Sequence, residues 1–428
     1  MRRAPELFTD DQIELEVGLT QVHRDAGRAL TPKKPSQDKA GWADLFPYYA
    51  GFSFDWASSH LKALTTSNQS TILDPWNGSG TTTLAAQAIG CKSVGVDLNP
   101  VACVVARARS MRPTSRSLPS IPSTPTRLRS DPPSGDPLGS WLDEHSVGRL
   151  RDWISTVSAI GYECRDAALL SGFIAVRRLT KSFEGTNRTW VKTARSSNAR
   201  ISLTDNEVDR EFRDSYEFVR NRSLQIPLSD TPSTVVLSSA SCLPVRDQSI
   251  STILTSPPYL TRIDYAVAYS RELAVLGIGE SDFRDLRSRL MGTTRIRSAG
   301  DSIVALHPKT AELLDAISKH SSRASSGYYL KQARQYFQDL AVSLQEISRV
   351  ASLNASMTLV VQDSFYKDIH LPLADIYVFE AARNGWHVED HQRFPVNRSM
   401  TSLNPSAKKY TKSTVTESVI VLRRISLS

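Results

Sequence analysis

Four consecutive residues, Ser256-Pro257-Pro258-Tyr259, form the segment best suited to chemistry, and they follow directly on the apolar run at 253–255. Two prolines restrict the backbone, so the Ser256 hydroxyl and the Pro257 carbonyl are held as hydrogen-bond acceptors. The aromatic ring that follows can stack on a flat heterocycle. Accepting both N–H bonds of an exocyclic base amine would free its nitrogen lone pair for attack on a methyl donor. The tetrad therefore predicts chemistry at an amino group of a planar ring.

A second motif lies upstream, where residues 72–82 read as a strand, a glycine-bearing turn and the start of a helix. Small residues at 78–80 let a ligand approach the backbone closely, and a helix that begins at Thr81 presents free N–H groups. Asp97 ends the next apolar segment, about twenty residues on, where an acidic residue can bind ribose hydroxyls. A turn that merely connects two elements is the alternative. The acidic strand end favours a nucleotide-cofactor site.

The elements that must position these motifs alternate between strands and helices. Helices are expected at 82–89 and 101–109, and Gly90 should end the first of them. Strand–helix–strand spacing of this kind implies parallel pairing with right-handed crossovers. The pattern predicts an α/β fold with a mostly parallel central sheet. The strands are expected at 71–74, 93–97, 234–237, 251–254, 357–361 and 418–422.

Composition divides the chain into four parts. Residues 1–38 are polar and predict an N-terminal arm, and residues 39–110 hold the cofactor motif as the first part of a catalytic domain. The part at 111–230 begins with a linker that carries seven prolines between positions 111 and 137. It continues as a mostly helical insertion. Residues 231–428 hold the tetrad and complete the catalytic domain.

Both motifs resemble those of the S-adenosylmethionine-dependent DNA amino-methyltransferases, and specifically the cytosine-N4 type with Ser-Pro-Pro-Tyr. The family's cofactor motif reads Asp-Pro-Phe/Met-x-Gly-Ser-Gly-Thr, and residues 74–81 match it everywhere except at Trp76. Serine in the first position of the tetrad is typical of enzymes that methylate N4 of cytosine, whereas aspartate or asparagine is typical of adenine-N6 enzymes. The cofactor motif precedes the tetrad here, an order that differs from the one most familiar for serine-type members.

The resemblance implies a Rossmann-like class I methyltransferase fold, interrupted by a largely helical insertion. It implies S-adenosylmethionine as cofactor, no metal, and double-stranded DNA in which the target cytosine is flipped out of the helix. Catalysis would rest on the tetrad 256–259, and Ser239 stands where the family has an acidic residue near the adenine. A cognate restriction endonuclease would be a functional partner. The residues assigned to cofactor binding are Asp74, Pro75, Asn77, Gly78, Ser79, Gly80, Thr81, Asp97 and Ser239.

Positive charge is concentrated at 176–200, which holds seven basic residues against one acid, Glu184. Aromatic side chains are interleaved with them, a composition that suits phosphate contacts and reading of base edges. A solvated helix face is the alternative. A second segment, 284–297, has five arginines against one aspartate and could lie over the duplex. The predicted DNA-contacting residues are Arg177, Arg178, Lys181, Arg188, Trp190 and Lys192.

Bulk properties exclude several classes of function. The net charge of +8 favours a polyanionic partner, and no apolar run is long enough to span a bilayer. Four cysteines occur singly, which argues against zinc sites and disulfides and favours the cytoplasm. None follows a proline, so covalent methylation at a ring carbon is not expected. An adenine-N6 enzyme, an RNA base methyltransferase and a catalytically silent DNA-binding homologue remain alternatives.

Overall fold

The computed structural model of the protein describes most of the chain from residue 45 to residue 425. The described residues are 32, 45–48, 51–65, 70–111, 118–125, 135–185, 187, 189–223, 229–260, 263–297, 304–396 and 415–425. Nearly all of the predicted N-terminal arm, much of the proline-rich linker and Arg188 lie outside these ranges.

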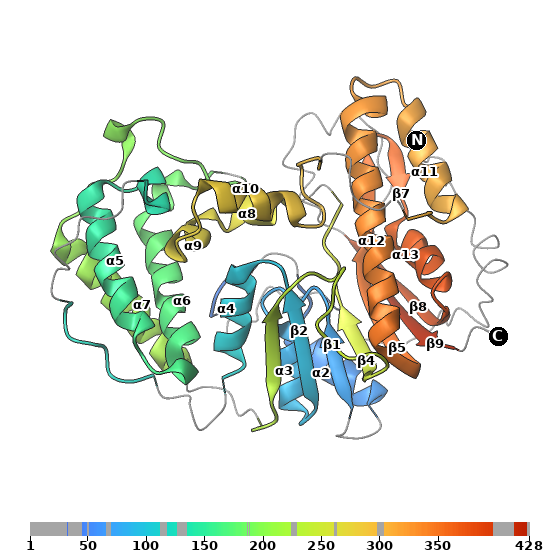
Figure 1. Ribbon diagram of the computed structural model, residues 1–428, viewed down its shortest axis with the longest axis horizontal. Coiled ribbons are helices and arrows are strands. Elements are labelled where there is room, and N and C mark those ends of the chain that lie inside the picture. The colour runs from blue at the N-terminus through green and yellow to red at the C-terminus, as the bar shows by residue number, and fades with distance from the viewer. Residues whose placement is uncertain are drawn as a thin grey trace.

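A seven-stranded sheet with the order β3-β2-β1-β4-β5-β9-β8 forms the centre of the molecule (Figure 1). Every pair from β3 to β5 is parallel, and β9 runs antiparallel to both of its neighbours. This sheet confirms the predicted α/β fold with a mostly parallel central sheet. The strands are β1 (Thr71–Asp74), β2 (Lys92–Asp97), β3 (Ser233–Leu237), β4 (Ile250–Thr255), β5 (Ala351–Gln362), β8 (Trp386–Val396) and β9 (Val415–Arg424).

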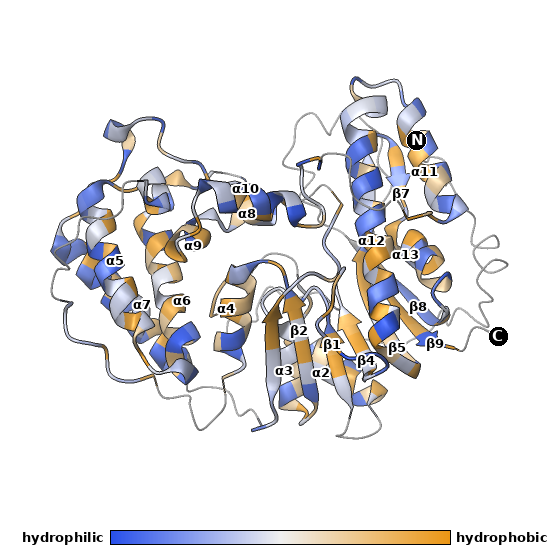
Figure 2. Ribbon diagram, in the orientation of Figure 1, coloured by the Kyte–Doolittle hydropathy of each residue, from blue (hydrophilic) through white to orange (hydrophobic). Residues whose placement is uncertain are grey.

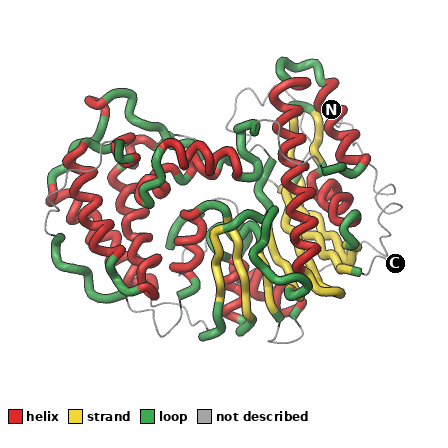
Figure 3. The backbone as a smooth tube through the Cα atoms, viewed as in Figure 1, coloured by secondary structure: helices red, strands yellow, loops and turns green. Residues whose placement is uncertain are grey.

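Helices cover both faces of the sheet, as the tube in Figure 3 shows. Ile72 on β1 packs against one core, with α2 and α3, whereas its neighbour Leu73 packs against another, with α11 to α13. Successive strand side chains point to opposite faces, so a strand buried on both sides needs a continuous apolar run. These helices are α2 (Phe54–Leu64), α3 (Thr81–Ala88), α11 (Pro308–Lys319), α12 (Leu330–Val350) and α13 (Leu373–Ala382).

A helical layer stands beside the sheet, and Figure 2 shows apolar residues on the helices where they face one another. It combines the predicted insertion with α4 and with three helices that follow the tetrad in sequence. The latter, α8 to α10, were expected to belong to the second part of the catalytic domain and instead pack on the insertion. The layer consists of α4 (Pro100–Arg109), α5 (Glu144–Ser158), α6 (Tyr162–Leu179), α7 (Asp205–Ser223), α8 (Tyr265–Ala268), α9 (Ser270–Val275) and α10 (Glu280–Arg289).

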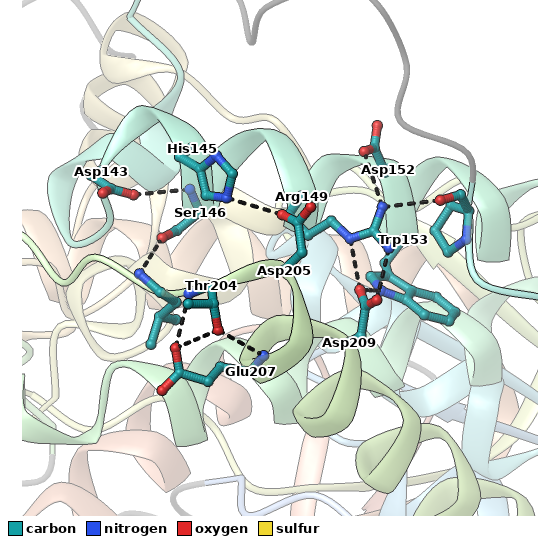
Figure 4. A network of polar contacts seen from close by, with 12 residues as sticks. Asp143, His145, Ser146, Arg149, Asp152, Trp153, Thr204, Asp205, Glu207 and Asp209 are labelled. Carbon is teal, nitrogen blue, oxygen red and sulfur yellow. Dashed lines mark hydrogen bonds and ion pairs between the residues drawn. The ribbon is translucent and has the colours of Figure 1, made fainter.

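A polar network locks α5 against α7 inside this layer (Figure 4). Arg149 donates to both carboxylate oxygens of Asp209 at 2.7 Å, and the Trp153 indole donates to the same carboxylate at 2.7 Å. Thr204 and Glu207 form a capping box at the start of α7. The helical layer is therefore fixed by specific side-chain contacts as well as by apolar packing.

The structure also contains elements that the sequence pattern did not indicate. The edge strand β8 and the short hairpin of β6 (Ser364–Tyr366) and β7 (Ile369–Leu371) were not expected. Charged residues interrupt the apolar alternation of β8, which removes the usual signal of a strand. Within the described ranges, the protein has no helix long and apolar enough to cross a membrane.

Candidate active site

One pocket lies at the carboxyl ends of the central strands, and both sequence motifs line it. Its volume is about 790 Å³ including the open mouth. Such a position, outside the carboxyl ends of parallel strands, is where α/β sheets bind ligands. The cofactor side comprises Pro75, Trp76, Gly78, Asp97, Leu98, Asn99, Ser239, Ala240 and Ser241, and the catalytic side comprises Ser256, Pro258 and Tyr265.

A buried carboxylate joins the two motifs behind the pocket. Asp74 accepts hydrogen bonds from the Thr82 and Thr255 hydroxyls, each at 2.6 Å, and from the Trp76 backbone N–H at 3.1 Å. Thr255 ends β4 and immediately precedes Ser256, so Asp74 connects the end of β1 to the start of the tetrad. The Asp74 carboxylate therefore accepts hydrogen bonds from other parts of the protein, and Asp74 does not line the pocket.

A second carboxylate organises the glycine turn from the pocket side. Asp97 accepts from the backbone N–H groups of Gly78 and Asn99, each at 2.8 Å. Burial raises the pKa of Asp97 to about 6, although these hydrogen bonds act to lower it. Burial likewise raises the pKa of Asp74 to about 6 against the effect of its three hydrogen bonds. Of the two, only Asp97 can reach a ligand in the pocket.

Close backbone packing explains the small residues of the turn. Gly78 and Gly80 have φ of 49° and 78°, in the left-handed region that glycine tolerates. A Cβ on Gly80 would lie 2.8 Å from the Ala106 Cβ on α4, so a side chain there would push the turn away from that helix. Asn77 is buried against β2, and the buried Arg109 side chain donates to the Ser79 carbonyl at 2.7 Å.

The nine predicted cofactor residues thus fall into two groups. Four of them line the pocket: Pro75, Gly78, Asp97 and Ser239. The others are not among its lining residues and support the turn from behind or begin α3: Asp74, Asn77, Ser79, Gly80 and Thr81. Phe52 and Phe54, just before and at the start of α2, pack into the cores, and the pocket residue from this part of the chain is Tyr48. No motif or spacing in the sequence marks Tyr48 as a site residue.

Neighbouring elements hold the backbone of the tetrad. The Tyr336 hydroxyl on α12 donates to the Pro258 carbonyl at 2.8 Å, and it lies 2.9 Å from the Tyr377 hydroxyl. On the other side, a Cβ on Gly292 would lie 2.5 Å from the Tyr259 carbonyl oxygen. Ser256 and Pro258 line the pocket, Pro257 is buried, and the Tyr259 side chain packs against the core of the helical layer.

The basic cluster of the insertion divides into buried and exposed members. Arg177 forms an ion pair with the fully buried Glu272 and lies 4.0 Å from the centre of the Phe46 ring, so only 14% of its side chain is exposed. Arg178 pairs with Glu211 at 3.1 Å. These pairs tie α6 to α9 and α7, but only Arg177 is enclosed, since 42% of the Arg178 side chain is exposed.

The loop that follows α6 carries further exposed members of the cluster. Lys181 and Lys192 are exposed, and Trp190 is 50% exposed, which is unusual for so large an apolar side chain. Arg188 lies outside the described residues. This loop and the exposed Arg178 are the described parts of the cluster that can reach a nucleic acid.

The second arginine segment divides in the same way. Arg287 donates to the buried Asp264 at 2.6 Å, and Arg297 pairs with Asp339 on α12. The side chains of Arg284 and Arg289 are more than half exposed, and Arg295 is exposed as well. Since Arg289 also lines the pocket, positive charge lies at its mouth.

Residues 22–107 match the DNA methylase family N6_N4_Mtase. The chain is 23% identical to the type II methyltransferase M.BsoBI of Geobacillus stearothermophilus over 58% of its own length and 55% of that protein. It is 22% identical to the type II methyltransferase M.AvaI of Anabaena variabilis over 89% of its length and 86% of that protein. The chain therefore spans about half of M.BsoBI, and it is a distant homologue of type II methyltransferases.

Solved structures with a similar arrangement include several methyltransferases. One is a SAM-dependent methyltransferase from Methanosarcina mazei, with a TM-score of 0.31 and 9% identity over 86% of this chain and 97% of that one. Another is the rRNA methyltransferase AviRa from Streptomyces viridochromogenes, with a TM-score of 0.30 and 10% identity over 92% of this chain and 96% of that one.

Proposed function

We propose that this protein transfers a methyl group from S-adenosylmethionine to the N4 amine of cytosine in duplex DNA, as the modification enzyme of a restriction–modification system. The observation that carries the proposal is the shared pocket, in which the glycine turn and Asp97 lie on one side and Ser256 and Pro258 on the other. The match to a DNA methylase family and the distant type II homologues support it.

The cofactor side of the pocket has the hydrogen-bond acceptors and apolar surfaces that S-adenosylmethionine needs. Asp97 would accept from the ribose hydroxyls, Leu98 and Ala240 offer apolar surface to the adenine, and Ser239 offers a hydroxyl to its amino group. The cofactor supplies an electrophilic methyl group on a sulfonium. Asp74 lies enclosed behind the turn, where its hydrogen bonds hold the two motif loops together, and it would not contact the ligand.

The catalytic side would act on the amine of the extruded base. The Ser256 hydroxyl and the Pro257 carbonyl accept its N–H bonds and raise the availability of the nitrogen lone pair. By its place in the tetrad Tyr259 would stack on the base, for which its ring must turn from the helical layer toward the pocket. Tyr336 and Gly292 keep the tetrad backbone in one position, so these acceptors need no rearrangement when the base arrives. No covalent bond between enzyme and base is required.

Duplex DNA would approach the mouth of the pocket. The exposed loop with Lys181, Trp190 and Lys192 and the exposed arginines of 284–295 provide positive charge for phosphate contacts. Flipping brings the target base out of the stack and into the pocket, because no buried amine could be reached inside the duplex.

The test is methyl transfer from labelled S-adenosylmethionine to unmethylated duplex DNA, followed by nucleoside analysis. Label in N4-methylcytosine supports the proposal, whereas label in N6-methyladenine assigns the adenine activity. Preferential labelling of RNA in a competition assay contradicts a DNA substrate. Absence of transfer together with absence of cofactor binding in calorimetry identifies a silent homologue.

A further inference from the structure

Three tyrosine rings with nearly parallel planes lead from the core of the helical layer to the pocket. The rings of Tyr48 and Tyr269 lie 4.6 Å apart at an angle of 10°, and those of Tyr48 and Tyr265 lie 6.4 Å apart at 19°. Tyr269 is fully buried, whereas Tyr48 and Tyr265 line the pocket together with Ser256. This ladder of three rings, Tyr269, Tyr48 and Tyr265, is therefore buried at its Tyr269 end and borders the pocket at its other end.

The open end of this ladder is held in place by a buried polar cluster. Asp264 caps α8 by accepting from the Val267 N–H at 3.2 Å, and the same carboxylate accepts from Arg287 at 2.6 Å and from Thr294 at 3.1 Å. Tyr265, the first residue of α8, follows directly on this cap. Its ring is thus positioned before any ligand binds, which lowers the cost of ordering it on binding.

The chemistry of the ladder suits a flat and uncharged partner. Burial raises the pKa of the Tyr48 and Tyr265 hydroxyls well above 10, so both rings stay neutral at physiological pH. A neutral aromatic face binds a heterocycle through offset stacking and apolar contact and does not depend on the hydroxyl. The tyrosines that line the pocket together with Ser256 are Tyr48 and Tyr265, whereas Tyr259 is not among its lining residues.

We propose that Tyr265, backed by Tyr48, forms a stacking platform for the extruded target base, as a second aromatic contact besides Tyr259. This inference rests on the proposed function, because it concerns the same pocket and the same substrate. It predicts that the aromatic ring at position 265 is needed for base binding and that the hydroxyl is not. Tyr265 would act on the affinity for the flipped base and leave the affinity for the cofactor unchanged.

The experiment compares Tyr265→Leu, Tyr265→Phe and Tyr269→Leu in the full chain. The probe is a duplex in which 2-aminopurine replaces the target base, at the site found by modification mapping of DNA from expressing cells. Stacking on a ring quenches the fluorescence of the flipped 2-aminopurine. Tyr265→Leu should lower this quenching and reduce kcat/KM for DNA on the order of tenfold or more, with unchanged affinity for S-adenosylmethionine in calorimetry. Tyr265→Phe should keep the quenching and the kcat/KM of the wild type.

Tyr269→Leu is the matched control, since it removes a ring of the same ladder that does not line the pocket. It should lower the unfolding temperature and leave the quenching intact. Wild-type quenching and kcat/KM in Tyr265→Leu would overturn the inference. The inference would also be overturned if Tyr265→Leu lost cofactor affinity and lost as much stability as Tyr269→Leu. That result would show that the Tyr265 ring serves packing alone. A wild-type protein that transfers no methyl group contradicts the proposed function, whereas normal transfer by Tyr265→Leu contradicts only the stacking role.

Discussion

The pocket and the basic segment at 177–192 show two ways in which charged residues serve one protein. Behind the pocket, Asp74 is enclosed, and its oxygens accept hydrogen bonds from two hydroxyls and a backbone N–H of the two motifs. In the basic segment, Arg177 is buried in an ion pair, whereas Lys181 and Lys192 remain exposed. Buried charges such as Asp74 and Arg177 thus hold the fold together, whereas the exposed lysines are available to a ligand.

Arg177→Ala gives the largest expected effect on stability. It leaves Glu272, which is fully buried, without its ion-pair partner, and breaking such a pair costs about 3–5 kcal/mol. Lys181→Ala, four positions on and exposed, is the matched control and should change the free energy of unfolding by less than about 0.5 kcal/mol. Urea denaturation measures both. Equal effects of the two substitutions would remove the distinction between the buried and the exposed half of the segment.

Asp74→Asn should change the pH dependence of stability. The folded protein holds the Asp74 proton up to about pH 6, whereas the unfolded chain releases it near pH 3.8. Protonation therefore stabilises the folded state, and this contribution is full below pH 3.8 and lost as the pH rises through 6. The wild type should lose about 3 kcal/mol relative to Asp74→Asn between pH 4 and pH 7. Urea denaturation at both pH values measures the difference, and a constant difference would contradict an enclosed carboxylate.

Gly80→Ala tests how closely the cofactor turn packs. The new Cβ combines a left-handed backbone with a 2.8 Å approach to Ala106, for a cost of about 2–4 kcal/mol. Gly90→Ala has almost the same φ, 77°, but open space around it, so it should cost only about 1–2 kcal/mol. Thermal unfolding compares the variants. If both cost the same, contact with α4 plays no part in holding the turn.

Lys192→Ala gives the smallest expected effect, and it changes the affinity for DNA and not the stability of the fold. Removing one phosphate contact should lower the slope of log K against log salt concentration by about 0.9. Lys92→Ala removes an equal charge at the amino end of β2, whereas the pocket lies at the carboxyl ends of the strands. This control should leave the slope unchanged. Fluorescence anisotropy over a range of salt concentrations measures both. A slope that changes equally in both variants would mean that net charge alone matters.

The sequence predicted those parts of the site that depend on local backbone rules. β1, β2 and β4 lie within about a residue of their expected ranges, because buried parallel strands need continuous apolar runs. The glycine turn was predicted because its left-handed residues need glycine. Both features are encoded by neighbouring residues, and the fold class follows from them.

Other features depend on contacts between distant segments and could not be predicted. The hydrogen bond from Thr255 to Asp74 joins residues that are 181 positions apart, and no local sequence pattern predicts it. The same holds for Tyr48, which reaches the pocket from an irregular segment. Composition gave Arg177 and Lys192 the same charge and hence the same expected role, although the fold of α6 buries one and the loop exposes the other.

The central claim is that a methyl donor and a base amine meet between the two motif loops, and Ser256→Ala tests it most directly. The measurement pairs the rate of methyl transfer to DNA with the affinity for S-adenosylmethionine in calorimetry. Loss of one acceptor that acts in the transition state should slow transfer by about 10²–10³-fold and leave cofactor affinity unchanged. Transfer by Ser256→Ala at the wild-type rate would contradict the account.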